Sequence, residues 1–261
     1  MSGFIALLFL IGYLWWPLVT DYLSTYNPAF PFWQQFDWLL LGNFLVMSLL
    51  IMAEANIKLD LPIILIGLAG GLTIESWGTQ TLLWTYYTRE RPPLWIIPAW
   101  PIASLSIDRL YRFLGGWTGR IPGWVFQWLY AAIFLGFYLV MWGFVWPTMD
   151  QSLTRMALFL CAFLILTPVD RRGMVLTFLA GAGLGYFLER WGTTRQCWIY
   201  YTHQTPPLFA VLAHGMAAVA FWRVLEVYRL FAARWGLKLG SNRVAIFKEM
   251  PVQEPELADN D

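Results

Sequence analysis

Two glutamates of this 261-residue chain, Glu75 and Glu189, stand within long apolar segments. A carboxylate in such a segment is costly unless it is paired, hydrogen-bonded or protonated, so it is by default a candidate functional residue. Burial favours the neutral carboxylic acid, which could donate a proton to a bound molecule near neutral pH. We therefore predict acid–base chemistry at these two positions, with a purely structural role as the alternative.

The two glutamates occupy equivalent positions in two copies of one segment, residues 67–94 and 181–208. The copies align without a gap, and Glu189 follows Glu75 by 114 positions. They share two glycines before the glutamate and a Trp-Gly-Thr run after it, then a Trp-x-Tyr-Tyr-Thr run and a Pro-Pro-Leu end. The chain is therefore predicted to contain an internal duplication.

The glycines around each glutamate predict close packing of the helix that carries it. Gly67, Gly71, Glu75 and Gly78 follow helical spacing and share one face, and the second copy repeats this pattern. Small residues four apart let membrane helices approach closely, so both glutamates should point into the bundle. We expect the first helix to end near Gly78, which would act as a left-handed cap, and the Pro-Pro pair to begin the next helix.

Aromatic residues follow each glutamate and could form a lid over the outer mouth of the bundle. Their ring faces could stabilise a positive charge, at on the order of 1–2 kcal/mol for each dry contact. A bundle this aromatic would suit a long apolar ligand, whereas the alternative is a belt of Trp and Tyr at the membrane surface. The predicted substrate-binding residues are Trp77, Trp84, Tyr86, Tyr87, Trp100, Trp191, Trp198, Tyr200 and Tyr201.

The two copies differ at a position that bears on the chemistry. Trp100 of the first copy is replaced by His214 in the second. His214 could hydrogen-bond to Glu189 or exchange a proton with it, so the predicted catalytic set is Glu75, Glu189 and His214, with simple packing of the histidine as the alternative. The sequence has no metal-ligand spacing, Walker loop, dinucleotide fingerprint or Ser-His-Asp arrangement. We therefore expect neither a metal nor another cofactor.

The composition is typical of a membrane protein. Hydrophobic residues make up 59% of the chain and charged residues only 13%, about half of the charged share in a soluble domain. Apolar runs near the length that crosses a bilayer fall at roughly 3–20, 37–54, 61–80, 93–113, 122–147, 154–169, 173–191 and 208–233. We predict an all-α polytopic membrane protein with about eight transmembrane helices in two parallel four-helix repeats.

The repeat divides the chain into a first four-helix repeat (1–114), a second four-helix repeat (115–233) and a cytoplasmic polar tail (234–261). With eight spans, twelve Lys and Arg residues fall on one side and five on the other. The positive-inside rule then predicts a multi-pass protein of the plasma (inner) membrane with both termini in the cytoplasm. Because each repeat has an even number of spans, the copies should run parallel.

The expected partners follow from the same composition. The net charge of +1 argues against a nucleic-acid partner. The lipid bilayer surrounds the chain, and a membrane lipid or isoprenoid is the expected ligand. Membrane-protein partners and homo-oligomerisation are left open.

The first copy and its continuation contain the motifs Glu75-x-x-Gly78, Trp84-x-Tyr86 and Pro93-Leu94-x-Ile96-x-Pro98-x-Trp100. This pattern resembles that of membrane-bound carotenoid hydratases of the bisanhydrobacterioruberin hydratase type, and is distantly similar to that of integral-membrane lycopene cyclases. The resemblance covers residues 70–105 and, less well, 184–215, where Leu212 and His214 depart from it. It implies a cofactor-independent mechanism in which a carboxylic acid protonates a polyene double bond, and water or an internal alkene meets the cation.

Three functions remain open from the sequence. The first is a cofactor-independent enzyme that modifies a lipid or isoprenoid, such as a carotenoid hydratase or cyclase, with Glu75 and Glu189 as acid–base groups. The second is a non-enzymatic membrane subunit that binds a pigment, a quinone or a lipid, or that docks onto a larger complex. The third is a small transporter whose repeats rock about a midplane site; the position of the glutamates toward the outer third of the membrane weakens it.

Overall fold

The computed structural model of the chain describes residues 2–166 and 170–235, so most of the predicted tail lies outside the described residues. Within these ranges the chain is almost entirely α-helical, with two short strands and three 3-10 turns. The elements are α1 (Ser2–Ser24), η1 (Phe32–Gln34), α2 (Trp38–Ala53), α3 (Ile57–Gln80), β1 (Trp84–Tyr86), η2 (Leu94–Ile96), α4 (Ala99–Trp117), α5 (Gly123–Val145), η3 (Trp146–Thr148), α6 (Ser152–Leu166), α7 (Arg171–Thr194), β2 (Trp198–Tyr200) and α8 (Leu208–Arg234).

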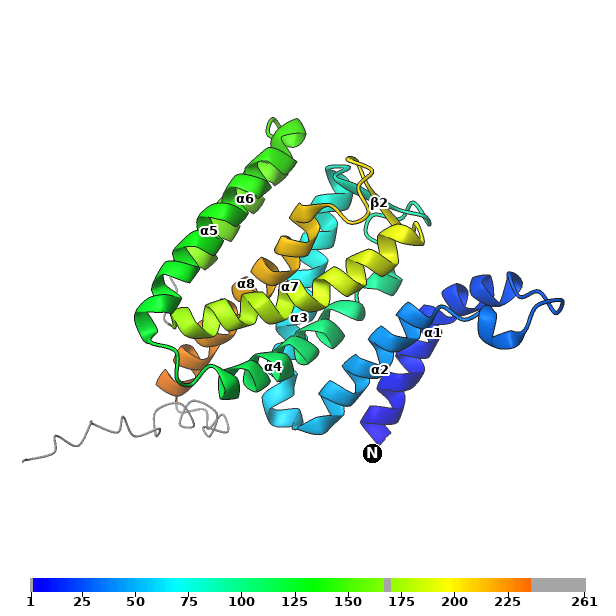
Figure 1. The fold of residues 1–261 in the computed structure, drawn as a ribbon, viewed down its shortest axis with the longest axis horizontal. Helices are drawn as coiled ribbons and strands as arrows, with labels where there is room; N and C mark the ends of the chain where they lie inside the picture. The colour runs from blue at the N-terminus through cyan, green and yellow to red at the C-terminus, as the bar shows by residue number, and fades with distance from the viewer. Residues whose placement is uncertain (1, 167–169, 236–261) are drawn as a thin grey trace, which may run out of the picture.

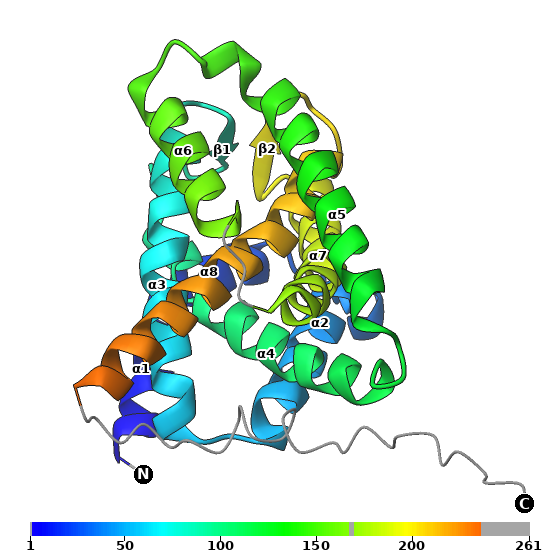
Figure 2. The same cartoon turned by 90° about the vertical axis from the view of Figure 1, so that its left-hand side faces the viewer.

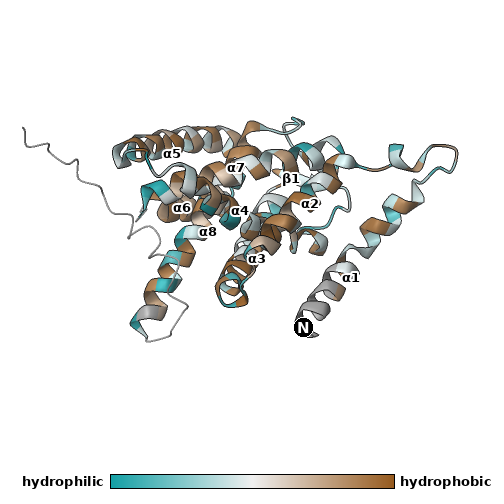
Figure 3. Cartoon of the chain, turned by 60° about the horizontal axis from the view of Figure 1, so that its bottom comes forward, coloured by the Kyte–Doolittle hydropathy of each residue, from teal (hydrophilic) through white to brown (hydrophobic). Residues whose placement is uncertain are grey.

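All eight apolar runs of the sequence form α-helices in the described ranges. Three stretches are long and apolar enough to cross a membrane: Ile57–Gln80, Gly123–Thr148 and Leu208–Ala232. Apolar residues recur along the helices (Figure 3), and many of them are exposed: for example, Leu65 of α3 and Leu139 of α5 are more than half exposed. These helices indicate a membrane protein.

The helices run up and down, and their ends gather along two edges of the molecule (Figure 1). In the middle, α4 packs against α3 and α7, and α8 packs against α3 and α7. The pair α1 and α2 lies to one side of this central group, and the pair α5 and α6 lies to the other (Figure 1). Figure 2 shows β1 and β2 at one end of the bundle, near the last turns of α3 and α7.

The two strands pair in antiparallel fashion and were not predicted from the sequence. Their register places Trp84 opposite Tyr200 and Tyr86 opposite Trp198. Successive side chains of a strand point to opposite faces, and these four rings are the buried ones. Each strand has only three residues, which is too short for an alternating pattern to be read from sequence.

The glycine face of α3 packs against α4, and the equivalent face of α7 packs against α8. A methyl group on Gly71 would overlap the ring of Trp100, and one on Gly185 would overlap the side chain of His214. A methyl group on Gly181 would lie 2.9 Å from the backbone of α8. These contacts confirm the prediction that the glycines face a neighbouring helix rather than lipid.

The prediction that Gly78 caps α3 is wrong. The helix continues to Gln80, and the left-handed conformation falls on Leu82, with φ of 61°. A methyl group on Gly78 would instead overlap the indole of Trp84. Glycine is required here because a ring lies across the helix, and its freedom at positive φ is not used.

The Pro-Pro pair begins α8 directly, as predicted, but it does not begin α4. Helix α4 starts at Ala99, after the intervening 3-10 turn Leu94–Ile96. Pro101 falls in the first turn of α4, where its missing N–H removes no intrahelical hydrogen bond. An earlier start would place this proline in the helix interior, where it breaks the hydrogen-bond ladder.

Buried charges join α3 and α4 at the end opposite the strands. Arg109 of α4 donates to both carboxylate oxygens of Asp60 at 2.8 Å and to Asp108 at 2.6 Å. The three side chains are at most 8% exposed. Removing one partner of a buried pair typically costs about 3–5 kcal/mol, so this cluster fixes α3 against α4 and thereby the level at which Glu75 sits.

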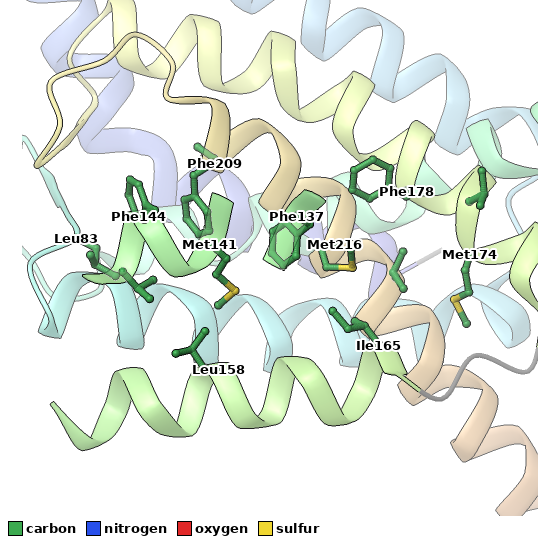
Figure 4. Close-up of a cluster of buried hydrophobic side chains, with 14 of the residues drawn as sticks. Leu83, Phe137, Met141, Phe144, Leu158, Ile165, Met174, Phe178, Phe209 and Met216 are labelled. Carbon is green, nitrogen blue, oxygen red and sulfur yellow. The ribbon is translucent and has the colours of Figure 1, made fainter. Parts of the chain in front are cut away.

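The apolar core lies where α5, α6, α7 and α8 meet. Phe144 of α5 stacks on Phe209 of α8 with ring centroids 4.1 Å apart (Figure 4). Met141, Phe137 and Met216 continue this cluster along the two helices (Figure 4). The packing holds α8, and with it His214, in a fixed position beside α7.

The indoles of Trp84 and Trp198 lie against Gly78 of α3 and Gly192 of α7, and substitution of these glycines tests the packing. Gly78→Ala and Gly192→Ala should each lower the free energy of unfolding by about 1–3 kcal/mol, because the added methyl group must displace Trp84 or Trp198. Gly183 of α7 has open space where its Cβ would lie, so Gly183→Ala should be neutral or stabilising by up to about 1 kcal/mol. Thermal unfolding in detergent measures all three, and equal melting temperatures would contradict the packing.

Candidate functional site

Glu75 lies in the penultimate turn of α3 and is 5% exposed. Its Oε2 accepts hydrogen bonds from the Nε1–H of Trp84 at 3.0 Å and from the hydroxyl of Tyr86 at 2.8 Å. Its Oε1 accepts a third hydrogen bond from the Nε1–H of Trp100 at 3.2 Å. Both oxygens of this buried carboxyl group are therefore occupied by neutral donors.

Glu189 holds the equivalent place on α7 and is 2% exposed. Its Oε2 accepts from the Nε1–H of Trp198 at 2.9 Å, and its Oε1 accepts from the hydroxyl of Tyr200 at 2.8 Å. His214 stands where Trp100 stands beside Glu75, but its Nε2 lies 3.7 Å from Glu189 Oε1. This distance is beyond a hydrogen bond, so Glu189 has one donor fewer than Glu75.

The strands deliver the donors to the two carboxyl groups. In each strand the tryptophan and the tyrosine are two residues apart and point to the same face, so both side chains reach back to the glutamate of the preceding helix. Burial, followed by the nearby carboxylate, raises the pKa of Tyr86 and of Tyr200 well above the usual value. Both hydroxyls therefore remain protonated and keep donating.

Ring contacts connect the two carboxyl sites across the strand pair. The centroids of Trp84 and Tyr200 are 5.8 Å apart, and those of Tyr86 and Trp198 are 6.0 Å apart. At the level of the central helices, Trp100 and His214 lie with their rings 5.7 Å apart. The two glutamates thus belong to one continuous aromatic cluster.

A cavity of about 1780 Å³ borders both carboxyl groups. Its wall is mainly apolar and is built from residues of all eight α-helices and both strands. From Glu75 and Glu189 it extends to Asp108 and Tyr111 on α4. The polar rim of the cavity is formed by wall residues of α1, of the segment between α1 and α2 and of the segment after α7: Asp21, Gln34, Gln35, Asp37, Arg195 and Gln196. Further polar wall residues, among them Asn43, Ser104 and Asp108, lie along the helices.

The structure brings together nearly all of the side chains predicted from sequence. Glu75, Glu189 and His214 line the cavity. The predicted aromatic residues that also line it are Trp77, Trp84, Tyr86, Tyr87, Trp100, Trp191, Trp198 and Tyr200. Tyr201 does not line it: its hydroxyl donates to the backbone oxygen of Phe144 at 2.7 Å, and its ring packs on the ring of that residue.

Three residues of the site were missed from the sequence. Trp95 lines the cavity and its ring contacts those of Tyr86 and Tyr87; its buried indole N–H has no hydrogen-bond partner among the described residues. Asp37 and Thr154 hold the indoles that pack beside the strands. A sequence signal existed only for Asp37, because an aspartate before an apolar run is a helix N-cap pattern.

Asp37 caps α2 and bonds to the end of α7. Its carboxylate accepts from Arg195 Nε at 2.8 Å, from Trp191 Nε1 at 2.9 Å and from the backbone N–H of Leu40 at 3.2 Å. Burial alone would raise the pKa of Asp37, but these hydrogen bonds bring the pKa below its usual value of 3.8. The carboxylate therefore stays ionised throughout the neutral range.

This depressed pKa predicts a pH-dependent stability. A lowered folded-state pKa stabilises the fold above the unfolded-state pKa, and this contribution is lost as the pH falls through the folded-state value, here below 3.8. Because Arg195 is 53% exposed, Asp37→Asn should lower the free energy of unfolding at neutral pH by up to about 1 kcal/mol. Unfolding at neutral pH and near pH 3 measures the difference between wild type and variant. A difference that persists unchanged in acid would contradict the assignment.

The site has no metal-binding group in the described part of the chain: no three His, Cys, Asp or Glu side chains come together there. Comparison of the chain with models of protein families, with curated proteins and with solved structures finds no match. The contacts around Glu75 and Glu189 therefore carry the functional conclusion.

Proposed function

We propose that this protein is a multi-pass membrane enzyme that protonates a double bond of a long apolar isoprenoid or lipid held in its cavity. Hydration or cyclisation of a polyene is the reaction class, and no cofactor takes part. One observation carries the proposal: two buried carboxyl groups border one apolar cavity and receive their hydrogen bonds from Trp and Tyr. Among the described residues, neither forms an ion pair with Lys or Arg.

The two carboxyl groups have different roles in this proposal. Three donors surround Glu75, and hydrogen bonds to the charged form of a carboxyl group favour that form. Glu75 is therefore the carboxylate that stabilises developing positive charge. Glu189 has two donors and faces His214, so it is the acid that gives up the proton.

The chemical step follows from this assignment. The proton of the Glu189 carboxyl group forms a bond to one alkene carbon, and the π electrons of the double bond form that C–H bond. The other alkene carbon becomes a cation, and Glu189 becomes a carboxylate. Water then adds to the cation, or an internal alkene closes a ring, and in either case a proton returns to Glu189, either directly or through His214.

The arrangement of the polar rim supports a water route to this half of the site. Asp37 and Arg195 line the cavity rim beside Trp191, whose side chain packs against Trp198. On the side of Glu75, the corresponding support is the buried Thr154. Both carboxyl groups border the cavity, and in this proposal water enters past Asp37 and Arg195, the charged wall groups that lie beside Trp191 on the side of Glu189.

We further propose eight membrane crossings in two parallel repeats, with both termini in the cytoplasm of the plasma membrane. The strand register supports the repeats, because each of the pairs Trp84–Tyr200 and Tyr86–Trp198 becomes the other when the copies are exchanged. Thr85 pairs with its own counterpart, Ile199. A two-fold axis that passes between Thr85 and Ile199, perpendicular to the strand pair, would exchange the two copies, and parallel repeats are related by such a rotation.

A second candidate function is a non-enzymatic membrane subunit that binds a pigment, a quinone or a lipid, alone or within a larger complex. The occupied oxygens of Glu75 favour it, since hydrogen bonds within the protein already satisfy that carboxyl group. In this case the cavity would hold its ligand without consuming it. The resemblance to carotenoid hydratases and lycopene cyclases favours the enzyme.

The proposal is tested with acyclic carotenes such as lycopene supplied to membranes containing the protein, with products separated by chromatography. Glu189→Gln should lower turnover by about 10²–10⁴-fold, because the proton donor is lost. Glu75→Gln should also slow the reaction, since a neutral amide stabilises the cation less. Glu90→Gln is the matched control, because Glu90 is exposed in the loop after β1.

Two results separate the alternatives. Full turnover by a folded Glu189→Gln variant would contradict the acid role. A wild-type protein that leaves every polyene unchanged, yet copurifies with a pigment, quinone or lipid identified by mass, would favour the binding subunit.

A further inference from the structure

Each acid of the site is supported by a residue from a distant part of the chain. Behind the strands stand Trp77 and Trp191, the tryptophans two residues after each glutamate. The Trp191 Nε1–H donates to Asp37 at 2.9 Å, and the Trp77 Nε1–H donates to Thr154 at 3.4 Å. In both cases the partner lies near the first turn of another helix, α2 or α6.

On the α7 side, a continuous series of contacts leads from the cavity rim to an acid. Asp37 holds the indole of Trp191, which meets the indole of Trp198 edge to face, with centroids 6.0 Å apart and an interplanar angle of 70°. Trp198 in turn donates to Glu189 at 2.9 Å. Asp37 also pairs with Arg195 at 2.8 Å, so this series begins at a charged group near the surface.

The α3 side has the same series built from neutral groups. Thr154 is fully buried and also shares a hydrogen bond of 2.9 Å with Thr148. The indole of Trp77 meets that of Trp84 at 5.8 Å and 89°, and Trp84 donates to Glu75 at 3.0 Å. The donor to each glutamate is thus held in place by a ring whose own position is fixed from elsewhere.

We propose that Asp37 and Thr154 are positioning residues, each of which sets the hydrogen bond received by one acid: Asp37 for Glu189 and Thr154 for Glu75. The inference deepens the proposed function and rests on it for the importance of that hydrogen bond. Neither residue touches the glutamate it serves. Each acts through two indoles, because a turned Trp191 or Trp77 leaves room for Trp198 or Trp84 to turn its N–H away.

Because each acid has its own series of contacts, the hydrogen bond to one acid can change while the hydrogen bond to the other stays the same. Loss of the acceptor at Asp37 is transmitted to Glu189 through Trp191 and Trp198, whereas the separate series through Thr154 leaves Glu75 unaffected. This arrangement also makes the acids dependent on distant segments, since Asp37 is 154 positions from Trp191 and Thr154 is 77 positions from Trp77. The hydrogen bond to Glu189 on α7 therefore depends on the position of α2, and the hydrogen bond to Glu75 on α3 depends on the position of α6.

Infrared difference titration of the full-length protein in lipid nanodiscs tests the inference without any substrate. The carboxyl band of each glutamate is assigned by its loss in Glu75→Gln or Glu189→Gln. Asp37→Ala should move the titration midpoint of the Glu189 band upward by about one pH unit, because a weakened donor stabilises the carboxylate less. The Glu75 band should stay in place. Thr154→Val should move only the Glu75 band by a similar amount.

Conservative variants separate positioning from general loosening of the fold. Thr154→Ser keeps the hydroxyl group and Asp37→Asn keeps an acceptor oxygen, so both should restore most of the wild-type midpoint. Trp191→Phe and Trp77→Phe remove the indole N–H groups that Asp37 and Thr154 accept from, so they should reproduce the shifts. They test the inference even if an alanine variant does not fold.

The outcomes are decisive for this inference and separate from those of the catalytic test. Selective shifts with rescue by the conservative variants support it. Shifts of both bands by one variant, shifts of neither, or equal effects of Thr154→Val and Thr154→Ser overturn it. A loss of turnover in Glu189→Gln bears only on the acid role, since the infrared titration requires no reaction.

Discussion

Two carboxyl groups inside an apolar bundle need hydrogen-bond donors that bring no charge with them, and this need organises the structure. Indole N–H and phenol O–H groups meet it, because they donate and are themselves largely apolar. The antiparallel pair of strands presents such groups to Glu75 and Glu189 at 2.8–3.0 Å. Gly78 and Gly192 are necessary because the indoles lie across the helices that carry the acids.

One sequence difference between the two copies makes the surroundings of their carboxyl groups chemically different. Trp100 donates to Glu75, but His214 in the equivalent place leaves a gap of 3.7 Å to Glu189. A tryptophan can only donate, whereas a neutral histidine can donate at one nitrogen and accept at the other. In the proposed mechanism, the site with the histidine exchanges the proton and the site with the tryptophan holds the negative charge. The single difference between Trp100 and His214 would then give two similar sites different tasks.

The repeat made much of the site predictable, because it marks the glutamates, the glycine face and the aromatic run by their recurrence. Positions of the helices followed from apolar run length. The strands and the role of Gly78 could not be predicted from the sequence. A strand of three residues is too short to show an alternating pattern, and the pattern around Gly78 predicts a helix cap where the structure has a close contact with the ring of Trp84. The helix N-cap pattern marks Asp37, but the contacts of Asp37 and Thr154 with their tryptophans could not be predicted, since each pair meets only through the tertiary fold.

A site of this kind must exclude water from a cation and still admit water when the reaction is a hydration. The polar groups are placed so that both conditions can be met. The cavity wall is mainly apolar, and at the polar rim Asp37 pairs with Arg195. The raised pKa of Tyr86 and Tyr200 keeps the groups nearest the acids neutral. The Trp and Tyr side chains that donate to the two glutamates are therefore uncharged, and in the proposed mechanism the charge that develops in the cavity meets only the carboxyl groups themselves.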